Sequence, residues 1–592
     1  MLLKKIGEHC NFLSSKLVFI MKKKLLVFSF LLFINQGYRS QNLIVIPDTI
    51  SGTSFNLNIY DTTNVFYTGY VTNTFGINAK YLGPTLFLNQ GDSVSMNVNN
   101  QLMDTTTIHW HGLHVSAKND GGPHIVIPPS AIWNPKFKVR DHAAMYWYHP
   151  HLHMMTNLHA TLGAAGVIIV RDTTERKLNL PRRYGIDDFP LVIQSKCFDA
   201  TKQIIIDNAY DSVMMVNGTV KGYLPAPAQV VRLRLLNASS ERVYNIGFQG
   251  NLIFHQIGTD GGLLNAPVAL TRLRLSPGER ADILIDLSGK VGQSINLMSY
   301  ASELPNAIYG ALQPGMGPGQ VIPGYASNIL NGANFSIMTF SVVAQTVSPV
   351  TTIPSTLIVN NPWVVGNANA FKTLTFSPVN MGPTAIQGPF LINNVSFDMD
   401  VINYTIPYNN IEVWTLDNQS PIAHPFHIHD VQFYITEING LLPPANMLGR
   451  KDVVLVPAGQ TVKFITKFET FCDTTGMYMY HCHMLPHEDD GMMGHFVVKC
   501  PLGIGVNELS SIQDDITIFP NPTSNKISIK RNSNEALWGV EVLDYAGKLI
   551  FSENKINSNE IELDLGTNSS EIYFLKIKSG EGFVYRKVSL IK

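Results

Sequence analysis

The chain has 592 residues, which is too long for a single hydrophobic core and predicts three or four domains. Hydrophobic residues make up 45% of the chain and charged residues only 15%, a balance that excludes an intrinsically disordered protein. The formal net charge is -1 and the body holds no run of Lys or Arg, so nucleic acid is excluded as an expected partner.

The N-terminus has the pattern of an export signal. Lys22, Lys23 and Lys24 precede a ten-residue apolar run that ends at Ile34, and a polar stretch continues to Gln41. This pattern predicts a signal peptide region over residues 1–41, with Met21 as an alternative start. A membrane anchor is the competing interpretation, but ten residues fall well short of the ~20 that span a bilayer. We therefore expect a secreted or cell-surface protein that passes through the periplasm.

Short segments in which apolar and polar residues alternate dominate the body of the chain. Such alternation predicts half-buried β-strands, and Gly, Pro and Asn clusters between the segments predict turns. Regularly spaced strands favour sandwiches or Greek-key barrels, so we expect an all-β fold with domains at 42–175, 176–350 and 351–505 and a further segment at 506–592. The clearest of these segments are Ser93–Val98, Val231–Leu235, Ala281–Leu287 and Val462–Phe468.

Ten of the eighteen histidines fall into four compact groups near the two ends of the body. The groups lie within His109–His111, His149–His151, His424–His429 and His481–His487. Residues two apart on a strand point to the same face, so each His-x-His pair offers two imidazoles to one metal cluster. A single pair is readily incidental. Four pairs in one chain, one of them enclosing a cysteine, instead predict a metal centre.

The cysteine in the last group has a distinct role. His481 and His483 face one way on an extended segment and Cys482 faces the other, so adjacent residues reach two different metal sites. Cys482 together with His424, His487 and the thioether of Met492 forms the ligand set typical of blue copper. The backbone around Cys482 is then a covalent connection between the two sites.

The other four cysteines indicate little dependence on disulfides. Cys10 lies in the presequence, and Cys197, Cys472 and Cys500 allow one bridge with one thiol left over. Three pairings remain open.

The last eighty residues differ in character and hold no cluster of metal-ligand residue types. Their motifs are Phe519–Pro522, Val542–Lys548 and Ile572–Ile577, with Arg586–Val588 near the end. The segment resembles the C-terminal sorting domain of type IX secretion cargo, a small β-sandwich. This resemblance implies an interaction with the secretion machinery, and an ordinary adhesive β module is the alternative.

From about residue 45 to residue 500 the four histidine motifs, in their order, resemble those of the three-domain multicopper oxidases. The resemblance implies three cupredoxin-like Greek-key barrels and four coppers per chain: one type 1, one type 2 and two type 3. By this likeness His424, Cys482, His487 and Met492 hold the type 1 copper. The type 2 copper takes His109 and His427, and the type 3 pair takes His111, His149, His151, His429, His481 and His483.

The resemblance also brings two carboxylates to the dioxygen site. Asp120 and Glu488 stand where relatives keep acids beside the copper cluster, and reduction of dioxygen to water consumes protons that carboxylates can relay. Asp120 has a simpler alternative role in shaping the turn Asn119–Gly122. Together with Cys482, these acids are the expected catalytic residues.

The expected activity is that of a copper-dependent oxidoreductase with dioxygen as acceptor. It couples four one-electron oxidations of a small reductant to the formation of water, and phenols, aromatic amines or low-valent metal ions are the expected reductants. We expect a monomer. The alternative function is copper sequestration or cuprous-ion detoxification in the cell envelope, although the stretch between residues 350 and 420 lacks a long Met-rich insertion.

Overall fold

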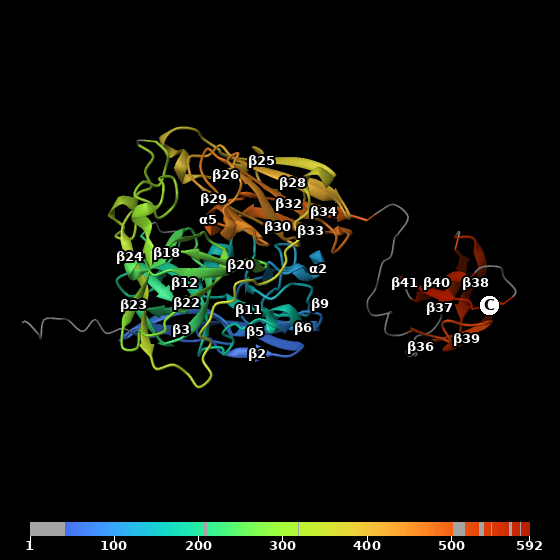
Figure 1. The fold of residues 1–592 in the computed structure, drawn as a ribbon. Coiled ribbons are helices and arrows are strands. Elements are labelled where there is room, and N and C mark those ends of the chain that lie inside the picture. The colour runs from blue at the N-terminus through green and yellow to red at the C-terminus, as the bar shows by residue number, and fades with distance from the viewer. Residues whose placement is uncertain are drawn as a thin grey trace, which may run out of the picture. The chain divides into compact units, whose positions relative to one another are not determined.

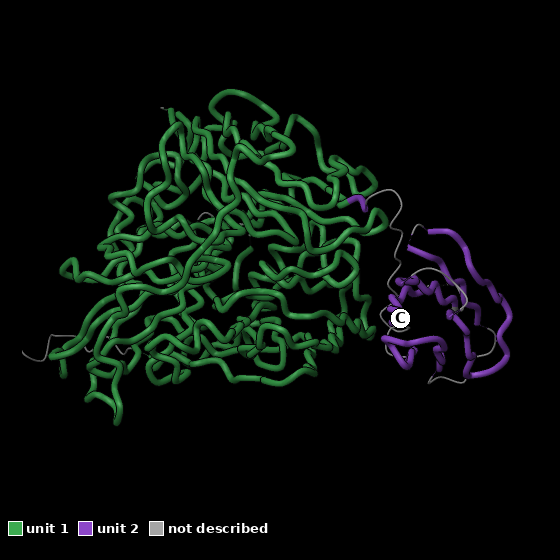
Figure 2. The backbone as a smooth tube through the Cα atoms, turned by 45° about the vertical axis from the view of Figure 1, so that its right-hand side comes forward, with its two compact units in different colours: residues 1–498 green, residues 499–592 purple. Residues whose placement is uncertain are grey.

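The computed structural model describes residues 42–206, 210–317, 319–500, 516–531, 538–545, 547–566, 571–579 and 582–591. Strands hold 49% of the residues and helices 8%, which confirms the predicted all-β class. The chain divides into two compact units, Met1–Val498 and Lys499–Lys592 (Figure 2). The predicted signal region lies outside the described residues. No helix within the described ranges is both long enough and apolar enough to cross a membrane.

Two sheets near the start of the larger unit enclose one core. Inward-facing residues such as Leu57, Leu86 and Ile168 come from both sheets and pack together without exposure to solvent. One sheet has the order β2 (Thr49–Ser51), β5 (Thr85–Asn89), β11 (Gly166–Arg171), β10 (Met145–His149) and β7 (His109–His111). The other consists of β4 (Tyr70–Ile77), β3 (Ser54–Tyr67), β6 (Ser93–Asn100), β8 (Ile132–Trp133) and β9 (Lys136–Lys138), and the short helices here are α2 (Ala117–Asp120), α3 (Thr156–Leu162) and α4 (Thr173–Arg176).

A second pair of sheets encloses the core of the middle segment, where Leu233, Ile246 and Phe340 pack together. The six-stranded sheet runs β1 (Asn42–Leu43), β16 (Gly222–Pro227), β24 (Asn334–Val343), β23 (Ser294–Tyr300), β18 (Tyr244–Phe248) and β21 (Leu273–Leu275). The eight-stranded sheet runs β15 (Thr219–Val220), β14 (Val213–Val216), β12 (Asp188–Phe198), β17 (Val230–Asn237), β22 (Arg280–Asp286), β19 (Phe254–Thr259) and β20 (Gly262–Leu270), and β13 (Ile204–Ile205) also pairs with β12.

The third pair of sheets carries two of the histidine groups on its strands. Its core includes Trp414, Phe426 and Phe464. One sheet runs β26 (Phe390–Ile392), β25 (Ala370–Pro378), β28 (Ile411–Asn418), β32 (Thr461–Lys467) and β30 (Phe433–Ile438). The other runs β27 (Tyr404–Pro407), β34 (Met493–Lys499), β33 (Asp473–Cys482), β29 (His424–Ile428) and β31 (Val453–Val456), and α5 (Leu485–Asp489) follows β33 (Figure 1).

The smaller unit is built from strands alone in the part that the structure describes. Its core residues, among them Ile527, Val540 and Leu575, come from both of its sheets. Three strands, β35 (Ile516–Phe519), β36 (Lys526–Arg531) and β39 (Glu560–Asp564), form one sheet. The other has the order β38 (Leu549–Ile556), β37 (Trp538–Asp544), β40 (Ile572–Ser579) and β41 (Gly582–Ser589). This is the small β-sandwich that the sequence predicts.

The four alternating segments singled out in the sequence all form strands, namely β6, β17, β22 and β32. The prediction that each is half-buried is wrong for β17, which is buried along its whole length, and for β22, in which only Asp286 is exposed. The polar face of β17 carries Arg232 and Arg234, which form buried ion pairs with Asp282 and Asp188. Each guanidinium has a carboxylate partner, which offsets the cost of removing its charge from water. This polar face can therefore be covered by protein.

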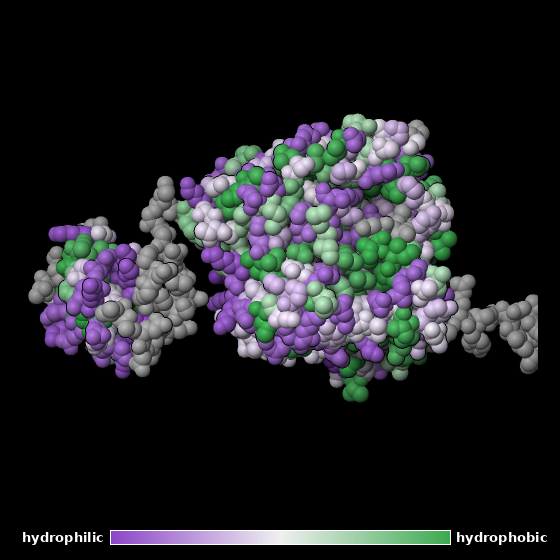
Figure 3. All heavy atoms as spheres, turned by 180° about the vertical axis from the view of Figure 1, so that it is seen from behind, coloured by the Kyte–Doolittle hydropathy of each residue, from purple (hydrophilic) through white to green (hydrophobic). Residues whose placement is uncertain are grey.

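The outer surface of the larger unit has no strict division by polarity. Hydrophilic and hydrophobic residues lie side by side on the face in Figure 3.

Candidate metal centres

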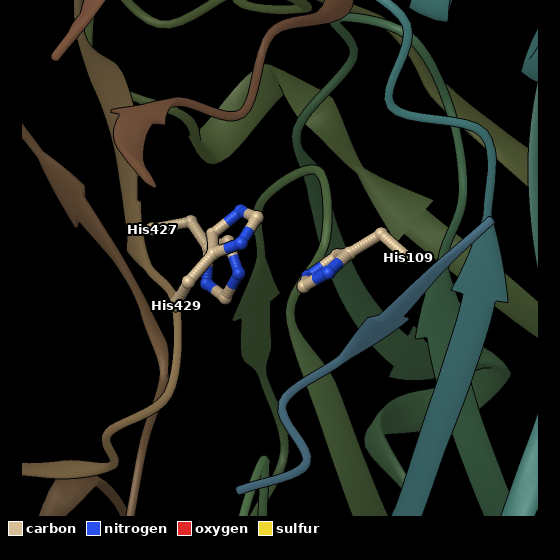
Figure 4. Close-up of side chains that lie close together, drawn as sticks. All are labelled: His109, His427 and His429. Atoms are coloured by element: carbon tan, nitrogen blue, oxygen red, sulfur yellow. The ribbon is translucent and has the colours of Figure 1, made fainter. Parts of the chain in front are cut away.

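Strand pairing brings the four His-x-His segments together in two sets. In the first set β7 pairs with β10, and His109 lies opposite His149. In the second set β29 pairs with β33, and His427 lies opposite His481. Figure 4 shows the imidazoles of the two sets turned toward each other, with His109 on one side and His427 and His429 on the other. Segments more than 300 residues apart thus line one buried pocket.

Eight imidazoles line this pocket, which we call the multi-histidine pocket. All eight are buried. Their ligand nitrogens lie within 4.8 Å of one another in three groups: His111, His149 and His483; His151, His429 and His481; and His109, His427 and His429. The structure therefore brings together every histidine that the sequence analysis assigns to the type 2 and type 3 coppers.

In the second group three ring nitrogens face one another, and two of them present lone pairs. Nδ1 of His429 donates to Asp120, and Nδ1 of His481 donates to the Cys482 carbonyl at 2.9 Å, so each Nε2 carries a lone pair. The three Nε2 atoms, including that of His151, are 3.1, 3.2 and 3.4 Å apart. Three nitrogens in a plane around one metal at about 2.0 Å are about 3.5 Å apart, so the arrangement fits a bound ion.

His109 and His427 show the same preparation for a cation. The Nδ1 of His109 donates to the Asp120 carbonyl at 3.0 Å, and that of His427 donates to the Asp452 carbonyl at 2.8 Å. Both Nε2 atoms are buried and have no hydrogen-bond partner. An orphaned buried polar atom is costly, and a metal ion would satisfy both lone pairs at once.

The group of His111, His149 and His483 also presents unpaired ring nitrogens to the pocket. His149 Nδ1 donates to the Pro150 carbonyl at 2.8 Å, and its Nε2 lies 3.4 Å from Nδ1 of His111. Both ring nitrogens of His483 are buried without a partner. Burial, reinforced by the neighbouring imidazoles, holds the pKa of His111, His149 and His483 well below the usual histidine value. Neutral imidazoles are the form that binds metals.

Carboxylates lie behind the histidines, on the side away from the pocket. Glu488 lies 3.4 Å from Nδ1 of His151 and 3.2 Å from Nδ1 of His481, so one acid contacts both rings. Burial opposes ionisation of Glu488, but His151 and His481 outweigh it and lower the pKa of this acid to about 2. Asp120 lies 2.7 Å from His429 and 3.3 Å from His109. Acids in this position orient metal ligands and raise their basicity.

Sequence analysis missed a third acid, Asp452, which precedes β31. Its carboxylate lies 3.1 Å from Nε2 of His111 and receives two bonds of 2.5 Å from the Arg280 guanidinium. The middle segment of the chain also supplies Gly278, where a Cβ would lie 2.9 Å from the His483 ring. Nothing in the sequence separates Asp452 from an ordinary charged residue at a strand start, because its partners are 172 and 341 residues away.

A second group, which we call the thiol pocket, holds Cys482, His424 and His487. The sulfur lies 3.6 Å from His424 Nδ1 and 3.7 Å from His487 Nδ1, and the two nitrogens are 3.2 Å apart. The Ser420 hydroxyl contacts the other nitrogen of His424 at 2.7 Å, which leaves Nδ1 directed at the sulfur. Two imidazoles and one thiol at these separations fit a trigonal copper site.

The surroundings of the thiol pocket are apolar. The Phe390 ring, which sequence analysis missed, lies 4.6 Å from both imidazoles. Met492 is fully buried in the same core, and its carbonyl accepts a bond from the Cys482 backbone at 3.0 Å. Burial raises the pKa of the Cys482 thiol, so a thiolate here needs a cation beside it.

The cysteines divide into two kinds. Cys472 and Cys500 are disulfide-bonded, whereas Cys197 and Cys482 are free. Cys482 is thus available as a ligand, and Cys10 lies outside the described residues.

Comparison with known proteins identifies relatives of both units. Residues 60–175 and 368–501 match two multicopper oxidase family models, and residues 517–592 match the secretion system C-terminal sorting domain. The multicopper oxidase mco of Staphylococcus haemolyticus is 34% identical over 442 residues, covering 73% of this chain and 86% of the relative. The cell division protein FtsP of Escherichia coli is 30% identical over 439 residues, with coverage of 73% and 87%.

Solved structures agree with these relatives. A laccase-like multicopper oxidase CueO of Ochrobactrum sp. has a TM-score of 0.67 and 29% identity, covering 77% of this chain and 100% of that one. McoA from Aquifex aeolicus has a TM-score of 0.68 and 27% identity, with coverage of 78% and 100%. The predicted cupredoxin-like barrels are confirmed, and the sorting domain marks the protein for export. From its motifs, its fold and its relatives together, this chain belongs to the multicopper oxidase family.

Proposed function

We propose that this protein is an exported oxidase that couples four one-electron oxidations of a small reductant to the reduction of dioxygen to water. The observation that carries the proposal is the shared segment His481–His483, in which Cys482 belongs to the thiol pocket and both histidines belong to the multi-histidine pocket. Four coppers, one in the thiol pocket and three in the other, would supply one-electron chemistry and the capacity to bind dioxygen.

The residues of this chain divide the work between the two pockets. His424, Cys482, His487 and Met492 would hold the mononuclear metal. His109 and His427 would hold the type 2 metal, and the other six imidazoles would hold the type 3 pair. A single peptide bond joins Cys482 to each neighbouring histidine residue, which provides a short, covalent path between the pockets.

Proton delivery is the proposed role of the acids. Glu488 is ionised at neutral pH because its pKa is held near 2, and it contacts two rings of the pocket. Asp120 contacts His429 and His109 from the other side. Each carboxylate can accept a proton transiently and pass it on toward the site proposed for dioxygen reduction. Asp120 also ends α2, so its role in the turn and its proposed role as a relay coexist.

The reductant is proposed to donate through His487. The residue His487 is 7% exposed whereas His424 is completely buried, so His487 lies nearer to solvent. Phenols and aromatic amines are the favoured reductants, and low-valent metal ions are the next class. The laccase-like description of the CueO relative supports the first class.

Two alternatives have specific support. Copper sequestration or cuprous-ion detoxification requires the same ligands but no turnover of organic reductants. A cell-division role is suggested by the name of the FtsP relatives. The presence of ten histidine ligands, Cys482 and Met492 favours an oxidase over both, because neither alternative needs two linked pockets.

Metal content, absorption and oxygen uptake together test the proposal. The purified protein is expected to bind four coppers, to absorb intensely in the red and to consume oxygen steadily with a phenolic dye. Uptake with Cu(I) alone would instead support detoxification. A protein that binds copper without consuming oxygen would support sequestration, and one without the red absorption would contradict the proposed thiol ligand.

A further inference from the structure

A separate pair of histidines lies outside both pockets. His124 is in the loop after α2 and His495 is in β34. Their Nε2 atoms are 3.0 Å apart and their ring centroids are 4.7 Å apart, although 371 residues separate them in the sequence. We call this contact the loop–strand histidine pair.

The distance between the two ring nitrogens of this pair resembles the distances between the imidazole nitrogens of the proposed metal ligands. Six contacts of 3.4 Å or less join imidazole nitrogens among the described residues, and five of them lie within the thiol pocket or the multi-histidine pocket. The loop–strand histidine pair is the sixth and the shortest. Two unprotonated imidazole nitrogens repel at this distance unless a proton or a metal ion lies between them.

The tautomer of His495 is determined by its surroundings. Its Nδ1 donates to the Val401 carbonyl at 3.2 Å, so its Nε2 carries a lone pair directed at His124. The ring is fully buried, with Phe397 packed 4.8 Å away, and the Asn403 side chain accepts a bond from the His495 backbone at 2.7 Å. One half of the pair is therefore a fixed, preorganised ligand.

The other half is open to solvent and has acidic neighbours. His124 is partly exposed, so an ion can reach its ring. Burial is the main influence on both imidazoles and lowers the pKa of each, to about 4 for His495, which keeps both neutral near pH 7. The exposed carboxylates Asp400 and Asp398 act electrostatically on His124 and His495, respectively, and supply negative charge that favours a cation.

We propose that His124 and His495 bind a divalent ion, Zn²⁺ or Cu²⁺, at a surface site distinct from the four coppers. Imidazole suits both ions, and water completes the coordination, while Asp398 and Asp400 contribute negative charge without being ligands. The bound ion joins the loop after α2 to β34 and thereby stabilises their contact. The competing explanation is a plain hydrogen bond in which Nε2–H of His124 donates to His495.

Zinc binding to the copper-loaded, full-length protein tests the site, with calorimetry and metal analysis as readouts. Wild type is expected to bind one Zn²⁺ more per chain than His124→Ala. His142→Ala is a matched control, since His142 is a surface histidine 4.0 Å from the Asp172 carboxylate, and this variant should keep the extra ion. Asp400→Asn should weaken zinc binding by about tenfold. Copper content and red absorption should not change in any variant.

His124→Gln separates the two explanations, because glutamine retains a hydrogen-bond donor but not the imidazole ligand. It is expected to lose the extra ion as completely as His124→Ala. Zinc should also raise the thermal midpoint of wild type but not that of His124→Gln. The proposal is overturned if wild type and His124→Ala bind equal amounts of zinc, or if His124→Gln retains the wild-type affinity.

Discussion

The segment His481–His483 contributes residues to both pockets, Cys482 to the thiol pocket and the two histidines to the multi-histidine pocket. The two pockets differ in the groups that lie behind these side chains. In the multi-histidine pocket, acids or backbone carbonyls hold the far side of every ring except that of His483, and Glu488 contacts two of the rings. In the thiol pocket the neighbours are the Phe390 ring and the Ser420 hydroxyl. None of the ion pairs among the described residues includes His424 or His487.

The difference matches the chemistry proposed for each pocket. Dioxygen reduction takes up protons, so its site benefits from carboxylates that pass protons on and whose negative charge offsets that of several metal ions. Electron collection needs no proton, and an apolar, tightly packed shell limits rearrangement when the metal changes charge. Substitutions that change one pocket and leave the other intact therefore test this difference.

Cys482→Ser should have the largest effect, because it removes the thiolate ligand and the path between the pockets. Oxygen uptake is expected to fall to the assay background and the red absorption to disappear, while three coppers per chain remain. Cys197→Ser is the matched control, since Cys197 is also free but lies outside both pockets. Persistent red absorption in Cys482→Ser would show that the thiol is not a copper ligand.

Glu488→Gln should slow oxygen uptake by about 100-fold, because the amide occupies the same space but cannot carry a proton as a carboxylate does. Red absorption should be unchanged, since Glu488 contacts histidines of the other pocket. Asp490→Asn changes an exposed acid two residues away and is expected to retain full activity. Unchanged turnover in Glu488→Gln would argue against the relay.

Phe390→Ala should reduce stability by about 3–5 kcal/mol, because a fully buried aromatic side chain is lost. The red band is expected to shift and turnover to change less than in Glu488→Gln. Phe464→Ala offers a control, because Phe464 packs in the same core against Trp414 and Phe426 without contacting the ligand rings. Phe464→Ala should lower the stability but leave the red absorption band in place. Equal spectra for the two variants would show that Phe390 does not influence the red band through its contact with the imidazoles.

Deletion of residues 510–592 should have the smallest effect on the chemistry, because the described residues of that unit line neither pocket. Copper content, red absorption and oxygen uptake should match the full chain, whereas the truncated protein should accumulate in the periplasm. Fractionation of cells measures its location. Finding the truncated protein at the surface or in the medium would refute the sorting role.

Local patterns in the sequence were sufficient to predict the strands and the histidines and cysteine that the structure brings together. Alternation along an extended segment has a period of two, so the opposite orientations of Cys482 and its neighbouring histidines follow from three adjacent residues. The same reasoning identified β6, β17, β22 and β32. It failed for the polar faces of β17 and β22, because an alternating pattern does not reveal whether a charged side chain will face water or a charged partner within the protein.

Only the tertiary structure decided which groups meet. Asp452 reaches His111, and His124 reaches His495, across 341 and 371 residues of chain, so neither contact leaves a local mark in the sequence. The position of Phe390 beside both imidazoles is likewise set by packing between strands. Side-chain periodicity is a property of neighbours along the backbone, whereas the shell around a metal is a property of neighbours in space, and folding alone joins the two.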